Sequence, residues 1–393
     1  MPWKEVRPMD QKMMFIAGYL RGDRIFSELC RLYGISRKTG YKWISRYERD
    51  GSKGLDELSR KPHSCPHQIP YAIRKEIIEL RQKRIKPGPK KIQSLLLKRY
   101  GESDIPSKTS IYNILRVEGL VERRKLRRHV PPGAKPLKAG RDPNDLWTAD
   151  FKGQFLTGDR QWCYPLTVMD DVSRYLLGCK GLSGTETRGG KEQFDKLFRE
   201  YGLPLRIRTD NGVPFASLST AGLSQLSIWW IRLGIIPERI DKGKPQQNGN
   251  HERMHRTLKD AVIKPPEKTM ARQQQAFDRF QVEYNEERPH ESLSQETPAS
   301  RYRPSPRRMP KQLPDIKYPG HYRVVHVSSH GVAYSFGKFI YVGHLLTGER
   351  IGLDEIADGI WNIYFGPVSL GHFDVREATN KWGYIKLKCN PCI

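Results

Sequence analysis

The sequence has few cysteines and no long apolar run. Its six cysteines are scattered through 393 residues, which argues against a disulfide framework and so against a small secreted scaffold. No stretch approaches the ~18 consecutive apolar residues of a membrane-spanning helix, and the first residues carry no apolar signal region. We therefore expect a soluble, cytoplasmic protein. Two Cys/His patches, at 63–67 and 389–392, have zinc-compatible spacings, but neither has a second ligand pair nearby.

Acidic residues are also scarce relative to basic ones. Lys and Arg number 69 against 43 Asp and Glu, which gives a net charge of +26. The excess is concentrated at the front, because residues 1–140 hold 33 basic and 14 acidic residues, whereas the remainder holds 36 and 29. A strongly basic front joined to a nearly balanced body is more typical of a nucleic-acid-binding module fused to another domain than of a merely basic surface.

Residues 1–60 predict a small helical unit. Apolar residues recur at helical spacing from Ile25 to Leu32, Gly34 follows, and Ser36 stands where it would cap the next helix. This is the pattern of a helix-turn-helix, whose second helix enters the major groove of DNA. Helices packed only for stability are the alternative. The predicted DNA contacts are the basic residues of the second helix: Arg37, Lys38 and Lys42.

A similar pattern returns in residues 70–128. Two helical stretches precede a third that Ser107 would cap, which predicts a second helix-turn-helix of the simple or the winged type. The polar face of its last helix supplies further predicted DNA contacts: Ser110, Asn113 and Arg116. Before the basic linker 129–145 comes a run that would follow backbone phosphates, unless it is only a solvated tether. Its predicted contacts are Arg123, Arg124, Arg127 and Arg128.

The rest of the chain predicts two further domains. Residues 146–302 read as three strands, a helix and a strand, and then further helices around one more strand, which is typical of an α/β domain with a mixed sheet. A linker rich in Pro and Arg covers 303–315. Residues 316–393 show short alternating stretches separated by glycine turns, the pattern of a small β-barrel.

Three carboxylates stand in contexts that set them apart. Asp150 lies in Trp-Thr-Ala-Asp-Phe-Lys on a predicted strand, Asp210 ends another strand at Thr-Asp-Asn-Gly, and Glu252 opens a basic helix. Brought together, they would form a site for a hard divalent cation, which prefers oxygen ligands. In so basic a chain the matching substrate is a phosphodiester, and two ions can promote its in-line displacement. We predict two Mg²⁺ ions, replaceable by Mn²⁺, with Asp150 as the bridging ligand.

The helix that Glu252 opens has a polar face. Glu252 is followed at i+3, i+4 and i+7 by basic or titratable residues, whereas apolar residues such as Met254 and Leu258 lie opposite. Taken alone, the pattern fits an ordinary solvated helix, and the two aspartates favour a functional one. The stripe is predicted to guide DNA toward the carboxylates, with three contacts: His255, Arg256 and Lys259.

These motifs resemble the core of bacterial insertion-sequence transposases, which share the retroviral-integrase-type DDE catalytic core. The resemblance lies in Trp147–Lys152, Thr209–Phe215 and Gly243–Arg253, and the tandem helical units and β-rich end extend it to nearly the whole chain. It implies a ribonuclease-H-like fold, metal ligation by Asp150, Asp210 and Glu252, and DNA contact by Lys259. The 41 residues between Asp210 and Glu252 exceed the spacing in many relatives, and we place the extra length in 216–232.

The resemblance further implies Mg²⁺-dependent transposition in a bacterial, nucleoid-associated protein. Water would release 3′-hydroxyl ends at the terminal inverted repeats, and these would attack double-stranded target DNA. Holding two ends together requires an oligomer. Two alternatives remain. The first is a catalytically silent or domesticated DNA-binding regulator, against which the intact triad argues. The second is a nuclease of the same fold without strand transfer, which would not need tandem DNA-reading units.

Overall fold

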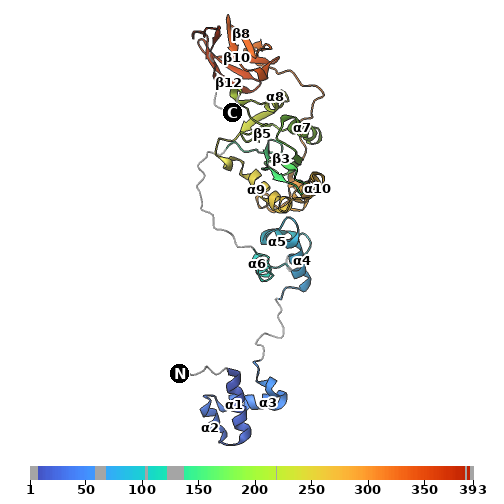
Figure 1. Cartoon of the computed structure of the whole chain (residues 1–393), viewed down its shortest axis with the longest axis vertical. Coiled ribbons are helices and arrows are strands. Elements are labelled where there is room, and N and C mark those ends of the chain that lie inside the picture. Colours follow the sequence, from blue (N-terminus) through green and yellow to red (C-terminus); the bar gives the residue numbers. More distant parts are fainter. Residues whose placement is uncertain are drawn as a thin grey trace. The chain divides into compact units, whose positions relative to one another are not determined.

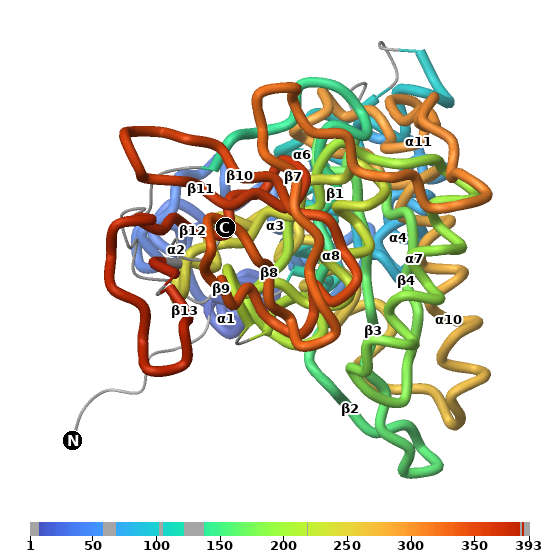
Figure 2. Tube along the Cα trace, turned by 90° about the horizontal axis from the view of Figure 1, so that it is seen from above, coloured from blue at the N-terminus to red at the C-terminus, as the bar shows by residue number. Residues whose placement is uncertain are grey.

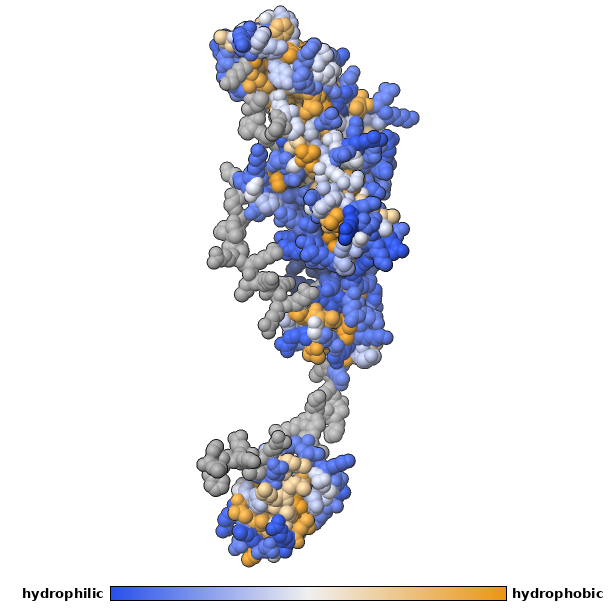
Figure 3. All heavy atoms as spheres, in the orientation of Figure 1, coloured by the Kyte–Doolittle hydropathy of each residue, from blue (hydrophilic) through white to orange (hydrophobic). Residues whose placement is uncertain are grey.

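The computed structural model describes residues 8–57, 68–101, 105–121, 137–217, 219–385 and 387–389. The chain divides into two compact units, Met1–Gln68 and Ile69–Ile393, and Figure 1 labels their elements. Hydrophilic residues cover much of the visible surface (Figure 3). Across the described ranges, no helix combines the length and the apolarity that crossing a membrane requires.

The first unit is a three-helix bundle. Ser36 begins its last helix as predicted, because its side chain accepts a hydrogen bond from the N–H of Thr39 at 3.1 Å. Gly34 takes a φ of +63° in the preceding turn, a conformation that glycine adopts without strain. The helix-turn-helix is therefore confirmed, although Ile25 and Leu32 are exposed instead of buried. The helices are α1 (Pro8–Arg21), α2 (Phe26–Leu32) and α3 (Arg37–Asp50).

The second unit begins with three more helices around a small apolar core. Ser107 caps the third of them by accepting from the N–H of Ser110 at 3.2 Å, while Ile111 and Leu115 are buried. Residues 68–101 and 105–121 contain no strand, so no wing lies in them. The predicted phosphate contacts Arg123, Arg124, Arg127 and Arg128 fall outside the described residues. The helices are α4 (Tyr71–Gln82), α5 (Pro89–Leu97) and α6 (Lys108–Val117).

A mixed sheet forms the centre of the second unit. Strand β3 pairs antiparallel with β1 and β4, β1 and β5 run parallel, and β5 and β6 also run parallel. Figure 2 shows β3 and β4 side by side. This arrangement confirms the α/β prediction. The strands are β1 (Leu146–Phe151), β2 (Phe155–Leu156), β3 (Trp162–Asp170), β4 (Leu176–Leu182), β5 (Arg206–Thr209) and β6 (Ile236–Arg239).

Helices cover both faces of this sheet, because its strands alternate apolar side chains between two cores. Trp147 packs on one face with Phe198 and Trp230, whereas Met169 packs on the other with Met254 and Phe280. In Figure 1 the labels β3 and β5 lie between α8 and α9. The helices are α7 (Thr187–Tyr201), α8 (Gln225–Arg232), α9 (Gly249–Leu258), α10 (Met270–Val282) and α11 (Pro298–Arg301).

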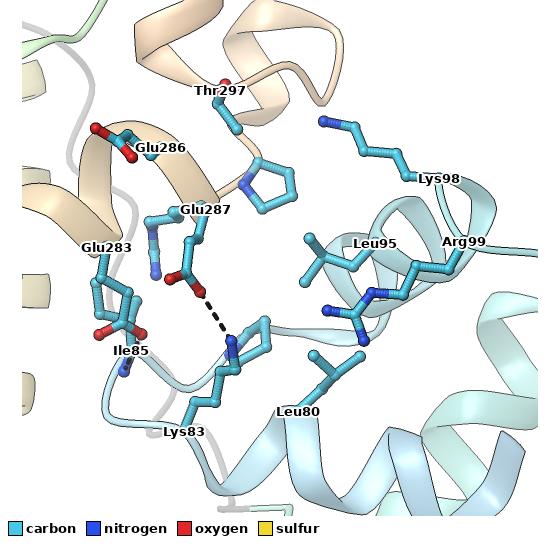
Figure 4. Close-up of a pocket in the computed structure, with 13 residues that line it drawn as sticks. Leu80, Lys83, Ile85, Leu95, Lys98, Arg99, Glu283, Glu286, Glu287 and Thr297 are labelled. Atoms are coloured by element: carbon cyan, nitrogen blue, oxygen red, sulfur yellow. Dashed lines mark hydrogen bonds and ion pairs between the residues drawn. The ribbon is translucent and has the colours of Figure 1, made fainter. Parts of the chain in front are cut away.

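Helices α4 and α5 dock on the end of α10 through a largely charged contact. Lys83 Nζ lies 2.8 Å from Glu287, and Lys90 Nζ lies 2.5 Å from Glu291. Ile85, which lies between α4 and α5 in the sequence, packs in the buried core to which α9 and α10 both contribute. A cavity of about 460 Å³ remains at this contact, and Figure 4 shows the ion pair of Lys83 and Glu287 among the residues that line it. The basic front of the chain is thus partly neutralised by core carboxylates.

The C-terminal strands form two sheets around one apolar core, not the closed barrel that the sequence predicted. One sheet has the order β14-β12-β11-β10-β7 and the other β13-β9-β8, and no ring of strands closes within the described residues. The sequence pattern predicted five strands, at 322–327, 332–336, 339–342, 350–352 and 361–365, and all five are present, whereas β12, β13 and β14 were missed. The strands are β7 (Arg323–His326), β8 (Val332–Ser335), β9 (Lys338–Tyr341), β10 (Arg350–Ala357), β11 (Ile360–Phe365), β12 (Val368–Asp374), β13 (Tyr384–Ile385) and β14 (Lys388–Cys389).

This C-terminal core includes part of the central domain. Leu223, Ile228 and Ile231, in and before α8, belong to the same buried cluster as Ile351 and Phe365. The segment 216–232, where we placed the extra length between Asp210 and Glu252, therefore supplies packing for the C-terminal sheets.

Candidate functional site

Asp150, Asp210 and Glu252 line one cavity of about 410 Å³. Strands β1 and β5 are parallel neighbours, so their C-terminal ends meet at one edge of the sheet and place the two aspartates there. Glu252 lies on the exposed side of α9, whose opposite side is anchored by buried Met254 and Leu258. The fold therefore brings together all three carboxylates that the sequence singled out.

The turn after β5 is built around the Asp210 carboxylate. Its Oδ1 accepts a hydrogen bond from the N–H of Gly212 at 3.1 Å, and a Cβ added at Gly212 would lie only 3.1 Å from Asp210 Oδ2. Asn211 donates from its side chain to the carbonyl of Ile240 at 2.7 Å, which ties this turn to the end of β6. The Asp-Asn-Gly sequence is thus explained by local geometry.

The carboxylates repel one another in a partly dry setting. Burial, together with the nearby charges of Asp210 and Glu252, raises the pKa of Asp150 to about 7. A cation among the three would relieve this repulsion. As the side chains stand, however, the described residues contain no group of three His, Cys, Asp or Glu that already converges as a metal site.

The loop beside the cavity is held by Asp241. Its Oδ2 accepts from Lys244 Nζ at 2.9 Å and from the Gln247 side chain at 3.1 Å, and the Lys244 hydrogen bond lowers the pKa of Asp241. Asp241 therefore orients this loop. Asp170 is likewise structural, because it accepts hydrogen bonds from the backbone N–H groups of Asn144 and Ser173 at 2.7 and 2.8 Å.

A buried polar network lies behind Asp150, and sequence reasoning missed it. The Thr167 hydroxyl lies 3.0 Å from the Asp150 carbonyl oxygen and 2.7 Å from the Nε2 atoms of both His251 and His255. On the far side of His251, Nδ1 lies 2.8 Å from the Thr148 hydroxyl. The network thus joins β1, β3 and α9. A signal existed, since Thr148 and Thr167 are polar residues within predicted buried strands.

Hydrogen-bond counting assigns the protons in this network. The Asp150 carbonyl can only accept, so the single Thr167 hydrogen points to it, and both imidazoles must donate from Nε2 to the Thr167 oxygen. A neutral His251 that donates from Nε2 must accept at Nδ1, so the Thr148 hydroxyl donates to it at 2.8 Å in preference to the Met169 carbonyl oxygen at 3.3 Å. Burial agrees with neutral rings, because it lowers the pKa of His251 to about 3 and, together with the neighbouring His251, also lowers the pKa of His255.

His255 corrects one prediction. We expected it on the DNA-facing stripe, but it is buried, and its Nδ1 lies 3.6 Å from Asp150 Oδ2. Arg256 and Lys259 are exposed as the stripe requires. Helix α9 ends at Leu258, and a π-helical turn, η5 (Lys259–Ile263), follows it.

The predicted contacts in the helical units lie on accessible surfaces. Arg37, Lys38 and Lys42 are exposed on α3, and Asn113 and Arg116 are exposed on α6, whereas Ser110 is half-buried. Lys42 Nζ also lies 5.2 Å from the centre of the Trp43 ring, within cation–π range. Their contact with DNA stays a prediction.

Comparisons with known proteins match the two parts of the chain separately. The family model for an integrase core domain matches residues 140–245, and a second integrase core model matches residues 233–298. Homeodomain-like models match residues 11–56 and 39–115. The matched core ranges contain Asp150, Asp210 and Glu252.

Similar proteins come from bacterial insertion elements and from retroviruses. An uncharacterized 31.7 kDa protein of insertion element IS407 from Burkholderia multivorans is 28% identical over 276 residues, 69% of this chain and 87% of that protein. A 39.2 kDa protein of insertion element IS476 from Xanthomonas euvesicatoria is 27% identical over 289 residues, 72% of this chain and 79% of that protein.

Among solved structures, the integrase catalytic core domain of HTLV-2 in complex with magnesium aligns with a TM-score of 0.33 and 17% identity, covering 42% of this chain and 99% of that domain. From the sequence matches and the carboxylate-bearing mixed sheet together, we conclude that the chain carries an integrase core domain behind homeodomain-like helical units and is related to the proteins of bacterial insertion elements.

Proposed function

We propose that the protein is the DDE-type transposase of an insertion sequence. It binds the terminal inverted repeats of its element, cleaves them to give 3′-hydroxyl ends and joins those ends to target DNA. The observation that carries the proposal is the meeting of Asp150, Asp210 and Glu252 at one cavity in an integrase core domain. The homeodomain-like units and the insertion-element relatives support its DNA specificity.

The donor set fits Mg²⁺ or Mn²⁺. Three carboxylates offer only oxygen atoms, which these hard cations prefer. Their negative charges repel one another and together attract a cation. Asp150 would bridge two ions, and Asp210 and Glu252 would each complete one. Glu252 is exposed on α9, so its side chain can rotate toward the aspartates. When bound, the ions would activate the attacking oxygen and neutralise the leaving one.

The protein's own residues bring the reacting groups together. In the first step water attacks the phosphorus at the element's end, and the bond to the 3′-oxygen breaks to leave a 3′-hydroxyl. In the second step that hydroxyl attacks a target phosphodiester, whose own 3′-oxygen leaves. Arg256 on α9 and Lys259 at the start of the following π-helical turn would hold the DNA backbone beside the cavity.

Two element ends must react together, so we propose that the active form is a homo-oligomer that pairs them. The helix-turn-helix contacts on α3 and α6 would select the ends, since each helical unit can read its own stretch of sequence. One retroviral intasome is among the structures that align with this chain, at a TM-score of 0.38. The word intasome describes the assembly of that protein and not an assembly of this chain.

Strand transfer on DNA that carries the cognate ends tests the proposal. With Mg²⁺ present, the wild-type protein should produce joined products, and Asp150→Asn, Asp210→Asn and Glu252→Gln should each lower the rate on the order of 10³-fold or more. The three substitutions keep side-chain size, so folding is checked by circular dichroism. Activity that survives any of them would remove that residue from the reaction.

Two further outcomes would replace the proposal. Cut ends that are never joined would identify a nuclease of the same fold. A protein whose end binding is intact but which neither cuts nor joins with either metal would identify a DNA-binding regulator.

A further inference from the structure

The three-stranded sheet β13-β9-β8 carries a row of exposed aromatic side chains. The most exposed are Trp382 and Tyr334, at 69% and 61%. On the same strands, the alternate residues Ala333 and Ile340 are fully buried in the C-terminal core. Outward positions of a solvated sheet are ordinarily polar, so these aromatics are not explained by packing. The aromatic face, as we call it, consists of four exposed side chains and the half-buried Tyr384; the exposed ones are Tyr334, Phe339, Tyr341 and Trp382.

The rings of the aromatic face stand at fixed positions. The ring centres of Tyr334 and Phe339 lie 5.2 Å apart, and those of Phe339 and Tyr384 lie 5.8 Å apart. Trp382 sits in a turn that Asn380 holds, because the Asn380 Oδ1 accepts from the N–H groups of Trp382 and Tyr384 at 2.9 and 3.0 Å. Lys381 Nζ lies 5.1 Å from the centre of the Trp382 ring.

A series of adjoining hollows connects this face with the carboxylates. The carboxylate cavity shares Asn211 and Lys242 with a second hollow of about 770 Å³. That hollow shares Ser219 with a third, of about 620 Å³, which is lined by Tyr341 and Trp382. The segment between β5 and α8 therefore forms the wall of a path from Asp210 to the aromatic face.

The chemistry of this path suits a polyanion with flat apolar parts. Among the described residues, neither the second nor the third hollow is lined by an acidic side chain, whereas Arg239 and Lys242 contribute positive charge. Polar side chains also line these hollows, at Ser217, Ser219, Thr220 and Asn380, with the two serine hydroxyls donating to the Leu223 carbonyl and Asn380 Oδ1 accepting from backbone N–H groups. Cationic and polar groups that track a backbone, beside aromatic rings that stack on bases, are the two components of a single-stranded nucleic-acid site.

We propose that the aromatic face and these hollows bind single-stranded DNA. Unpaired bases stack on Tyr341 and Trp382, and the sugar-phosphate backbone follows Lys242 toward the carboxylate cavity. The duplex-reading helical units cannot serve this purpose, since stacking requires bases that are not paired. That the strand runs toward the carboxylate cavity rests on the proposed function, because a single strand would be led there only if the carboxylates act on DNA.

Binding of a fluorescein-labelled oligothymidylate to the full-length protein tests the proposal. Fluorescence anisotropy is recorded in EDTA, so no turnover occurs, and at raised salt, so purely electrostatic binding is weak. Trp382→Ala and Tyr341→Ala should each weaken binding roughly 5- to 150-fold, the effect of losing one stacked base. Trp382→Phe should retain most of the affinity. Trp162→Ala, which removes another exposed tryptophan from the start of β3, should have no effect.

Two further measurements make the result specific. Affinity for a duplex of the same length should be unchanged by Trp382→Ala, and an oligonucleotide with 5-iodouracil should cross-link to the peptides that contain Tyr341 or Trp382. Equal losses for duplex and single strand, or unchanged single-strand binding in the folded Trp382→Ala/Tyr341→Ala protein, would overturn the proposal. A sedimentation shift of that double variant to a smaller oligomer, with oligonucleotide binding intact, would instead assign the face to a second copy of the chain.

The Asp150→Asn protein separates this inference from the proposed function. It should bind the oligothymidylate as the wild type does, because the aromatic face is intact. If this variant still performed strand transfer, the proposed function would fail while the single-strand site stood. If strand transfer required Asp150 but the aromatic substitutions left oligonucleotide binding unchanged, only the further inference would fail.

Discussion

At the scale of single residues, Thr167 joins three segments of the core through one hydroxyl. Its one hydroxyl contacts the Asp150 carbonyl, His251 and His255, and so fixes α9 against the strand that bears Asp150. Glu252 lies between the two histidines in sequence, so the distance between Glu252 and Asp150 depends on this contact. Neither histidine is free to act as a base at neutral pH, because burial keeps the pKa of each low.

Thr167→Val should therefore destabilise the protein and impair metal binding together. The substitution keeps the shape but leaves buried N–H groups unpaired, which should cost about 1–3 kcal/mol in the free energy of unfolding. Denaturant unfolding measures that loss, and Mn²⁺ titration by calorimetry measures the affinity. Thr167→Ser should restore both. Thr257→Val, which removes a hydroxyl from the outer side of α9, is the matched control.

Arg256 and Lys259 differ from Glu252 in the effect expected of their loss. They are exposed and would meet phosphates, so Arg256→Ala and Lys259→Ala should weaken DNA binding uniformly across sequences. Each should also reduce the slope of log affinity against log salt by about 0.9. Binding measured at several salt concentrations gives the slope. His255→Ala should leave the slope unchanged, since His255 is buried. If His255→Ala reduced the slope as much as Arg256→Ala does, His255 would belong to the DNA-facing stripe after all.

At the scale of elements, the docking of α5 on the core places a lysine in an unfavourable position. Burial and the nearby charge of Arg288, opposed by the charge of Glu291, lower the pKa of Lys91 to about 7. His290 lies in the same cluster, where burial and the charge of Lys91 lower its pKa to about 3. The cationic form of Lys91 thus weakens this contact.

The stability of the second unit should consequently rise with pH above about 7. The unfolded lysine keeps its proton to about pH 10, while the folded one releases it near pH 7, so the folded state binds fewer protons across that window. Lys91→Met should raise the free energy of unfolding at pH 6 by about 1–3 kcal/mol and flatten the pH dependence. Calorimetry between pH 6 and 9.5 measures both. Lys90→Met, at the neighbouring exposed lysine, should leave the pH dependence in place.

At the scale of the whole molecule, the C-terminal sheets and the central domain share one apolar core, whereas Met1–Gln68 is a separate compact unit. Removing residues 1–68 should therefore leave the melting temperature of the remainder within about 2 °C, while weakening DNA binding. Removing residues 316–393 should lower it by about 10 °C or more, because Leu223, Ile228 and Ile231 lose their partners. Differential scanning calorimetry of the two truncated proteins distinguishes these outcomes, and equal melting temperatures would contradict the shared core.

The sequence by itself determined the elements and the candidate site. Helical spacing and serine caps defined both helical units, and alternation defined the strands, because these signals depend on residues only a few positions apart. Asp150, Asp210 and Glu252 could be chosen in advance since each has a distinctive local context. Their convergence followed from β1 and β5 being parallel neighbours, as an α/β domain requires.

Only the tertiary structure decided what depends on contacts between distant segments. The helical spacing of His255 predicts an exposed residue, yet His255 is buried and hydrogen-bonded to Thr167 on β3. The C-terminal strands alternate as barrel strands would, but their pairing produces two sheets that close over α8. The π-helical turn after Leu258 and the docking of α5 on α10 are likewise invisible to periodicity, since long-range packing outweighs local preference wherever the two disagree.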